Sequence, residues 1–182
     1  MIRFISTVLP DVPGCPNALI KNEVLSSAIE LCERSSIYTV KLTEQVLKDA
    51  ESLTLTLPVN TGLVEINKIV VDDVTTYEID NDGTTIDFDG KAASDYTMAV
   101  YVSLKPLRNA TALPDILFND WYQTIAAGAK AKLMVMPEKP WTNLKVAGLH
   151  SQVFDSGANS AMKKVFAKNM PTEKRISRRM GI

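Results

Sequence analysis

The spacing of apolar residues changes twice along this chain of 182 residues, and these two changes constrain the fold more than any other feature. Between Asn17 and Ser35, apolar residues recur at the spacing of an amphipathic helix. From Ile37 to Pro106 they alternate with polar residues, which is the period of a strand. Helical spacing returns after Pro114. The sequence therefore predicts an α+β fold in which a β segment separates two helical segments.

The β segment is expected to hold about six short antiparallel strands with short connections, arranged as a small sandwich or barrel-like sheet. The stretch DNDGTT is typical of a hairpin, because Asn, Asp and Gly tolerate the positive φ angles of a tight turn. This hairpin would join Tyr77–Asp80 to Ile86–Phe88. The clearest strand is DYTMAVYVSLKP, which places one set of side chains on a single face: Tyr96, Met98, Val100, Val102 and Leu104.

The helical segment after Pro114 reads as a hairpin. Its first helix is expected over about residues 114–136, with Trp121 on the apolar face. Pro137 and Pro140 then stop the helix and set a stiff turn. Trp141 follows inside that turn, so its ring is expected to fill the junction between the two helices.

Thr142 or Asn143 is expected to cap the second helix of the hairpin, which would run to about Lys168. Alanine and glycine dominate residues 126–131 in the first helix, and such small side chains allow two helices to approach closely. This close packing is expected either within the chain or between neighbouring subunits.

The N-terminal residues 1–16 contain Pro10, Pro13 and Pro16. Each proline lacks a backbone donor and restricts the residue before it, so this segment is expected to be an extended arm or loop. It is interpreted as mature structure and not as a signal peptide.

Chemistry-bearing motifs are sparse. The sequence has no G-x-S-x-G, H-E-x-x-H or glycine-rich phosphate loop, so we expect no enzyme and no cofactor. Cys15 and Cys32 are interpreted as reduced thiols, and with the single His150 they are too few for a zinc site. The acids around DNDGTTIDFDG are interpreted as turn residues. No apolar run approaches the roughly 18–20 residues that span a bilayer.

Charge is unevenly distributed, although the net charge is only −1. The stretch from Glu44 to Asp95 holds 12 acids and 3 lysines, a net charge of −9. The stretch from Lys163 to Ile182 holds 7 bases and 1 acid, a net charge of +6. The basic tail is therefore expected to meet an acidic protein surface, a nucleic acid, or no fixed partner.

Most of the chain resembles the head–tail connector, or adaptor, proteins of tailed bacteriophages. The resemblance lies in the order of three stretches: LPDVPGCPNALIKNEVLSSAIELCERSS, then LPDILFNDWYQTIAAGAKAKLMVMPEKPWTN, then AGLHSQVFDSGANSAMKKVF. Between the first two, residues 38–106 match only in their all-β character. The resemblance implies a helical core made of residues 1–36 and 107–168, an inserted antiparallel β domain at 37–106, and a C-terminal docking tail at 169–182.

The resemblance also implies a function. Such proteins form rings, commonly of twelve copies, beneath the portal protein, and the ring extends the channel through which genomic DNA passes without sequence-specific contact. The chain would then be a virion protein of the neck, present in the host cytoplasm during assembly, and it would present a surface to the next neck, nozzle or tail protein, with no membrane contact. The tail would dock to the portal through Lys174, Arg175, Ile176, Arg178, Arg179, Met180 and Ile182.

Two other functions stay open from the sequence. One alternative is another neck or tail-completion component that has the same overall plan but binds a different neighbour. The other alternative is an accessory protein that binds nucleic acid through its basic tail.

Overall fold

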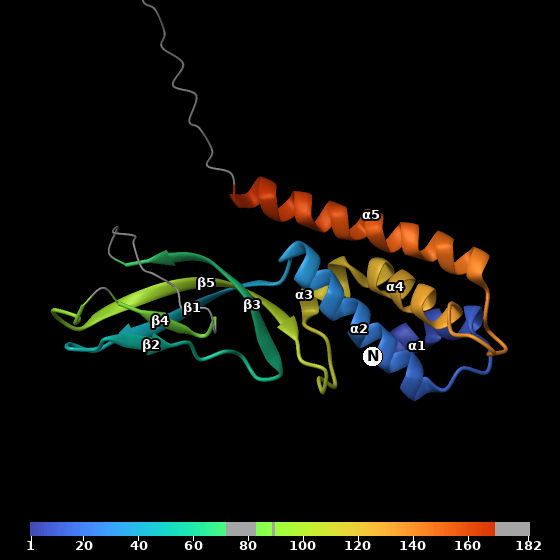
Figure 1. Cartoon of the computed structure of the whole chain (residues 1–182), viewed down its shortest axis with the longest axis horizontal. Coiled ribbons are helices and arrows are strands. Elements are labelled where there is room, and N and C mark those ends of the chain that lie inside the picture. The colour runs from blue at the N-terminus through green and yellow to red at the C-terminus, as the bar shows by residue number, and fades with distance from the viewer. Residues whose placement is uncertain (72–82, 89, 170–182) are drawn as a thin grey trace, which may run out of the picture.

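The structure is a computed structural model that describes residues 1–71, 83–88 and 90–169. Within these ranges helices gather at one end of the molecule and antiparallel strands at the other (Figure 1), which confirms the predicted α+β class. In chain order the elements are α1 (Ile2–Val8), the 3-10 helix η1 (Leu9–Asp11), α2 (Asn17–Ser35), β1 (Thr39–Val46), β2 (Ser52–Thr54), β3 (Thr61–Val70), β4 (Thr85–Asp87), β5 (Tyr96–Pro106), α3 (Asp115–Asp120), α4 (Tyr122–Met134) and α5 (Leu144–Asn169).

The helices share one hydrophobic cluster. Helix α4 lies between α2 and α5, and α5 is the outermost helix of the group (Figure 1). The cluster draws its fully buried large side chains from five elements or their flanks: Phe4, Val8, Val12, Ile20, Val24, Leu31, Leu117, Ile125 and Leu133. Helices from before and after the β segment therefore bury their apolar faces against each other.

The expectation of an extended N-terminal arm is wrong, because residues 2–11 form helix α1 and the 3-10 helix η1. Phe4, Val8 and Val12 are spaced by four residues and are fully buried in the helical cluster, so burial of this stripe stabilises helical turns. Pro10 does not oppose this, because proline is tolerated in the first turn of a helix.

The helix expected over residues 114–136 is interrupted. Trp121 has φ −120° and ψ 15°, which are not helical values, and it separates α3 from α4. On either side of this break, Phe118 and Tyr122 place their rings 5.8 and 4.4 Å from the ring of Phe4. The change of direction therefore lets both aromatic residues cover helix α1.

Helix α5 begins after Asn143, whose Oδ1 accepts a hydrogen bond from the backbone N–H of Val146 at 3.2 Å. Asn143 is therefore the cap, in agreement with one of the two expected residues. The hydroxyl of Thr142 is used within the turn, where it accepts from the N–H of Lys139 and donates to the carbonyl of Met136.

The β part contains a three-stranded sheet with the order β1-β5-β3 and a two-stranded sheet formed by β2 and β4, and all pairs are antiparallel. In β5 the expected inward face is confirmed, because Met98, Val100, Val102 and Leu104 are fully buried in a second hydrophobic cluster and Tyr96 packs against it partly buried. The opposite face of the three-stranded sheet carries Tyr101 and other alternate residues of β5.

The expected hairpin between Tyr77–Asp80 and Ile86–Phe88 has its first arm outside the described residues. Its second arm is β4, which pairs with β2. Five strands are present in the described ranges, compared with the roughly six expected from the alternation. The alternation shows where a chain is extended but not which strand lies beside it.

The two parts meet where α2 leads into β1. Ser36 has a left-handed backbone with φ 52° and ends α2, and Ile37 is buried in the helical cluster. Tyr38 then packs against both hydrophobic clusters. Across this junction Lys105 of β5 forms an ion pair with Glu33 of α2 at 2.5 Å. At this junction, sheet residues such as Lys68 and Tyr101 line the same cavity as Lys164 and Val165 of α5.

Candidate interaction surfaces

The turn between α4 and α5 is held by hydrogen bonds. Its prolines, Pro137 and Pro140, are exposed, while Trp141 is only 9% exposed and packs in the helical cluster. The backbone N–H of Asn143 donates to the carbonyl of Met134 at 3.0 Å, which closes the turn. The ring of Trp141 thus fills the end of the helix pair, which is the place the sequence predicted for it.

Trp121 lies at the break between α3 and α4 and packs partly buried against the helical cluster. The ammonium group of Lys164 on α5 lies 5.7 Å from the ring centroid of Trp121 and 3.3 Å from Asp120. This tryptophan therefore helps to place the C-terminal half of α5 against α3.

The small residues of α4 are buried within the chain. Ala126, Ala127 and Ala129 are at most 5% exposed. A Cβ atom added to Gly128 would lie 2.7 Å from Phe154 of α5 and 2.9 Å from the hydroxyl of Ser27 of α2. This run therefore allows α4 to contact α2 and α5 closely, and it is not available to a neighbouring subunit.

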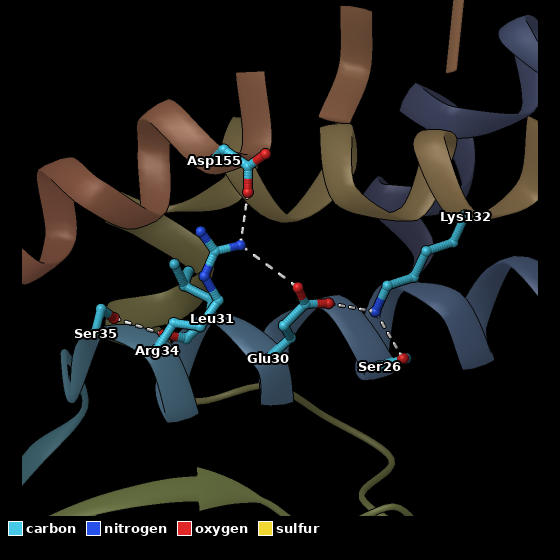
Figure 2. A network of polar contacts seen from close by, with 7 residues as sticks. All are labelled: Ser26, Glu30, Leu31, Arg34, Ser35, Lys132 and Asp155. Carbon is cyan, nitrogen blue, oxygen red and sulfur yellow. Dashed lines mark hydrogen bonds and ion pairs between the residues drawn. The ribbon is translucent and has the colours of Figure 1, made fainter. Parts of the chain in front are cut away.

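A polar network joins the three long helices (Figure 2). Arg34 of α2 binds Asp155 of α5 at 2.7 Å and Glu30 at 3.5 Å, and Glu30 also binds Lys132 of α4 at 2.9 Å. Lys132 in turn donates to the hydroxyl of Ser26 at 2.8 Å. The network orients α5 along the pair formed by α2 and α4. Its ion pairs contribute little to the free energy of unfolding, because they are partly exposed to solvent.

The outward side of α5 exposes apolar side chains, and the middle of the helix carries little charge, whereas the exposed Lys145, Lys163 and Lys164 lie near its two ends. The described residues contain ten exposed large hydrophobic side chains, and five are on this helix: Leu144, Leu149, Val153, Met162 and Phe166. From Val146 to Met162 the only residue charged at neutral pH is Asp155, which is already bound to Arg34. We call this side of the helix the α5 outer face.

His150 does not add a charge to this region. Burial, followed by the nearby Lys130 ammonium group, lowers the pKa of the His150 imidazole below its usual value. Lys130 itself is bound to Asp11 at 2.6 Å. His150 is therefore neutral at pH 7.

A cavity of about 490 Å³ lies at the junction of the helices and the sheet. We call it the junction cleft. The sheet contributes Thr39, Asn67, Lys68 and Tyr101, while Ile37, Ile116, Lys164 and Val165 complete it from the helical side. Apolar side chains and two lysines from opposite walls thus face the same space, an arrangement that the sequence alone did not indicate.

Cys15 and Cys32 are buried free thiols, and burial raises the pKa of Cys32 to about 12, so this thiol is unreactive at neutral pH. Within the described ranges, no three or more His, Cys, Asp or Glu side chains gather into a metal site, and no helix is long and apolar enough to cross a membrane.

The residues expected to dock to the portal, from Lys174 to Ile182, lie outside the described part of the chain. No known family model matches this sequence, and comparison with curated proteins found no match. The α5 outer face and the junction cleft are two candidate interaction sites among the described residues.

Proposed function

We propose that this chain is a structural virion protein, an oligomeric adaptor that joins the portal to the tail of a bacteriophage. In this proposal residues 1–36 and 107–168 are the helical core, residues 37–106 are an inserted β domain, and residues 169–182 dock to the portal. About twelve copies form a ring that extends the DNA channel and presents a surface to the next neck or tail protein.

The observation that carries the proposal is the α5 outer face. A solvated helix normally places charged residues on its exposed side. Here Leu149 and Val153 are 57% and 53% exposed, and the stretch around them has a single paired charge. Exposed apolar surface of this kind is typical of protein–protein contact. The face therefore favours a protein that assembles over one that acts as a free monomer.

The mass of the purified chain, measured alone and after mixing with the portal of the phage that encodes it, tests the proposal. We expect a high-mass ring in at least one of the two samples, since a monomer has a mass of 20.0 kDa. A species that stays near the monomer mass in both samples would contradict the proposed function.

Introducing a charge into the α5 outer face should prevent assembly. We expect Val153→Glu to lower the yield of the high-mass species at least about tenfold, because a carboxylate would lose its hydration in the contact. Val59→Glu is the matched control, since Val59 is 87% exposed and lies in the β part. Light scattering of the two variants measures this, and equal yields would exclude the α5 outer face from the assembly.

Removing residues 170–182 should abolish docking to the portal while leaving the fold intact, because these residues follow the last turn of α5. Co-sedimentation of the truncated chain with the portal measures docking, and circular dichroism checks the fold. The accessory nucleic-acid function makes a different prediction. It requires duplex binding that weakens steeply with salt and disappears in the truncated chain, with portal docking unaffected.

A further inference from the structure

The turn that follows β1 lies at the end of the β part farthest from the helices (Figure 1). Leu47 follows β1 and is 65% exposed. The turn is closed by a hydrogen bond from the N–H of Ala50 to the carbonyl of Leu47 at 3.2 Å. The N–H groups of the two residues between them also donate, that of Lys48 to Asp95 at 2.7 Å and that of Asp49 to the carbonyl of Ala92 at 2.8 Å.

This turn is therefore preorganised. An apolar side chain on a fixed backbone loses little conformational entropy when it binds a partner. Leu47 is therefore well placed to act as an anchor residue at an interface. Burial also offsets the unfavourable hydration of an exposed leucine. We call this turn, together with the charged residues around it, the β tip.

Charges around the β tip are mainly negative. The charged residues of the β tip that the structure describes are Lys48, Asp49, Glu51, Asp87, Lys91 and Asp95, a net charge of −2. Lys91 is paired with Glu51 at 3.4 Å, and the N–H of Lys48 occupies one oxygen of Asp95. Asp49, two residues from Leu47, has no ion-pair partner in the described ranges, so its carboxylate is available to a cation.

The junction cleft has the complementary character. Ile37, Ile116 and Val165 provide apolar surface, and Lys68 and Lys164 provide positive charge. Lys164 forms an ion pair with Asp120 at 3.3 Å, whereas Lys68 makes no ion pair within the described part of the chain. At about 490 Å³, the cleft falls within the range of roughly 300–1,000 Å³ typical of binding pockets.

We propose that the β tip of one copy binds in the junction cleft of a second copy, with Leu47 on the apolar surface and Asp49 beside Lys68. The β tip follows the last residue of β1, whereas Thr39, the first residue of β1, lines the cleft, so the contact is heterologous. A contact between two different surfaces of identical subunits repeats from copy to copy, and it closes into a ring when the rotation allows. The inference rests on the self-association in the proposed function, but not on the portal.

The composition of the cleft also distinguishes this occupant from others. A nucleic acid backbone would satisfy the lysines but would leave Ile37, Ile116 and Val165 without an apolar partner. The basic tail of a neighbouring copy carries the same sign of charge as the cleft lysines, so it would be repelled. A surface that combines one apolar anchor with carboxylates satisfies both parts of the cleft.

Disulfide trapping tests the contact in the full-length chain. A Leu47→Cys chain is mixed at high concentration with a Thr39→Cys chain, because Thr39 lines the cleft. The native thiols of Cys15 and Cys32 are buried and do not compete. The control is a mixture of Val59→Cys and Thr39→Cys chains, in which a disulfide forms only through random collisions. The disulfide between Leu47→Cys and Thr39→Cys chains should form at least about tenfold faster than in this control. Equal rates for the two mixtures would overturn the proposal.

Charge exchange provides the second test, read as the yield of the same disulfide. Lys68→Glu in the Thr39→Cys chain should lower the yield about tenfold, and adding Asp49→Lys to the Leu47→Cys chain should restore it. Lys21→Glu, a substitution at an exposed lysine of α2, is the control and should have no effect. Absence of rescue would reject the pairing of Asp49 with Lys68.

Failure of this inference is distinguishable from failure of the proposed function. A ring that forms normally with Leu47→Ser and shows no preferential disulfide would overturn the β-tip contact and leave the adaptor function standing. Preferential trapping in a chain that never binds the portal would retain the contact and reject the adaptor function.

Discussion

Replacing Trp141 with alanine should lower the free energy of unfolding by about 3–5 kcal/mol, the range found for large aromatic side chains removed from a core. The ring is 9% exposed and packs in the cluster shared by the helices, so its loss leaves a cavity at the end of the α4–α5 pair. The prolines on one side and Asn143 on the other hold the turn, which limits how far the chain can collapse into this space. Urea denaturation followed by far-UV circular dichroism measures the change.

Trp141→Phe is the matched control. The indole Nε1 is buried and has no hydrogen-bond acceptor in the described part of the chain, so phenylalanine removes an unsatisfied donor while keeping most of the apolar ring. We expect this variant to lose clearly less stability than Trp141→Ala, because phenylalanine still fills most of the space and leaves a smaller cavity. If Trp141→Ala unfolds at the same urea concentration as the wild type, the ring does not stabilise the helical hairpin.

Replacing Gly128 with valine should be the second most damaging change, at about 2–3 kcal/mol, near the upper end of the usual cost of overpacking. Even a Cβ atom at this position would lie 2.7 Å from Phe154 and 2.9 Å from Ser27. Phe154 is 4% exposed and Ser27 is fully buried, so neither side chain has free space to move into. Helices α4, α2 and α5 would have to separate.

The same substitution at Gly148 controls for helix propensity. Gly148 lies in α5, and a Cβ atom there would meet nothing within 4 Å. Valine is a somewhat better helix former than glycine, so Gly148→Val should change stability by less than about 0.5 kcal/mol. Thermal unfolding compares the two variants, and a similar melting temperature for both would show that the close approach at Gly128 is not required.

The α+β class and the orientation of β5 follow from local periodicity. Residues that alternate or recur every three to four positions place one set of side chains on one face whatever lies beside them. For this reason the helix over Asn17–Ser35 and the inward face of β5 were predictable. Residue types narrowed the cap of α5 to Thr142 or Asn143, and the structure shows that it is Asn143. The site of Trp141 was predictable as well, because two prolines leave a short turn in which a large ring must be buried.

The N-terminal helix and the break at Trp121 were not predictable in this way. Three prolines made residues 1–16 resemble an extended arm, but Phe4 and Val8 gain more from burial against α2 and α4 than an isolated helix of this length would lose. At Trp121 the sequence continues a helical pattern, and packing of Phe118 and Tyr122 on Phe4 redirects the chain.

By itself, then, the sequence determined which segments are helical or extended and which of their faces are apolar, because these properties depend on neighbours a few residues apart. Only the tertiary structure decided that β4 pairs with β2, that the small residues of α4 are buried within the chain, and that Lys68 and Lys164 face one cleft. Each of these depends on contacts between residues far apart in the chain. Which of these contacts form depends on how much surface the whole fold buries and which polar groups it pairs. A short stretch of sequence does not contain this information.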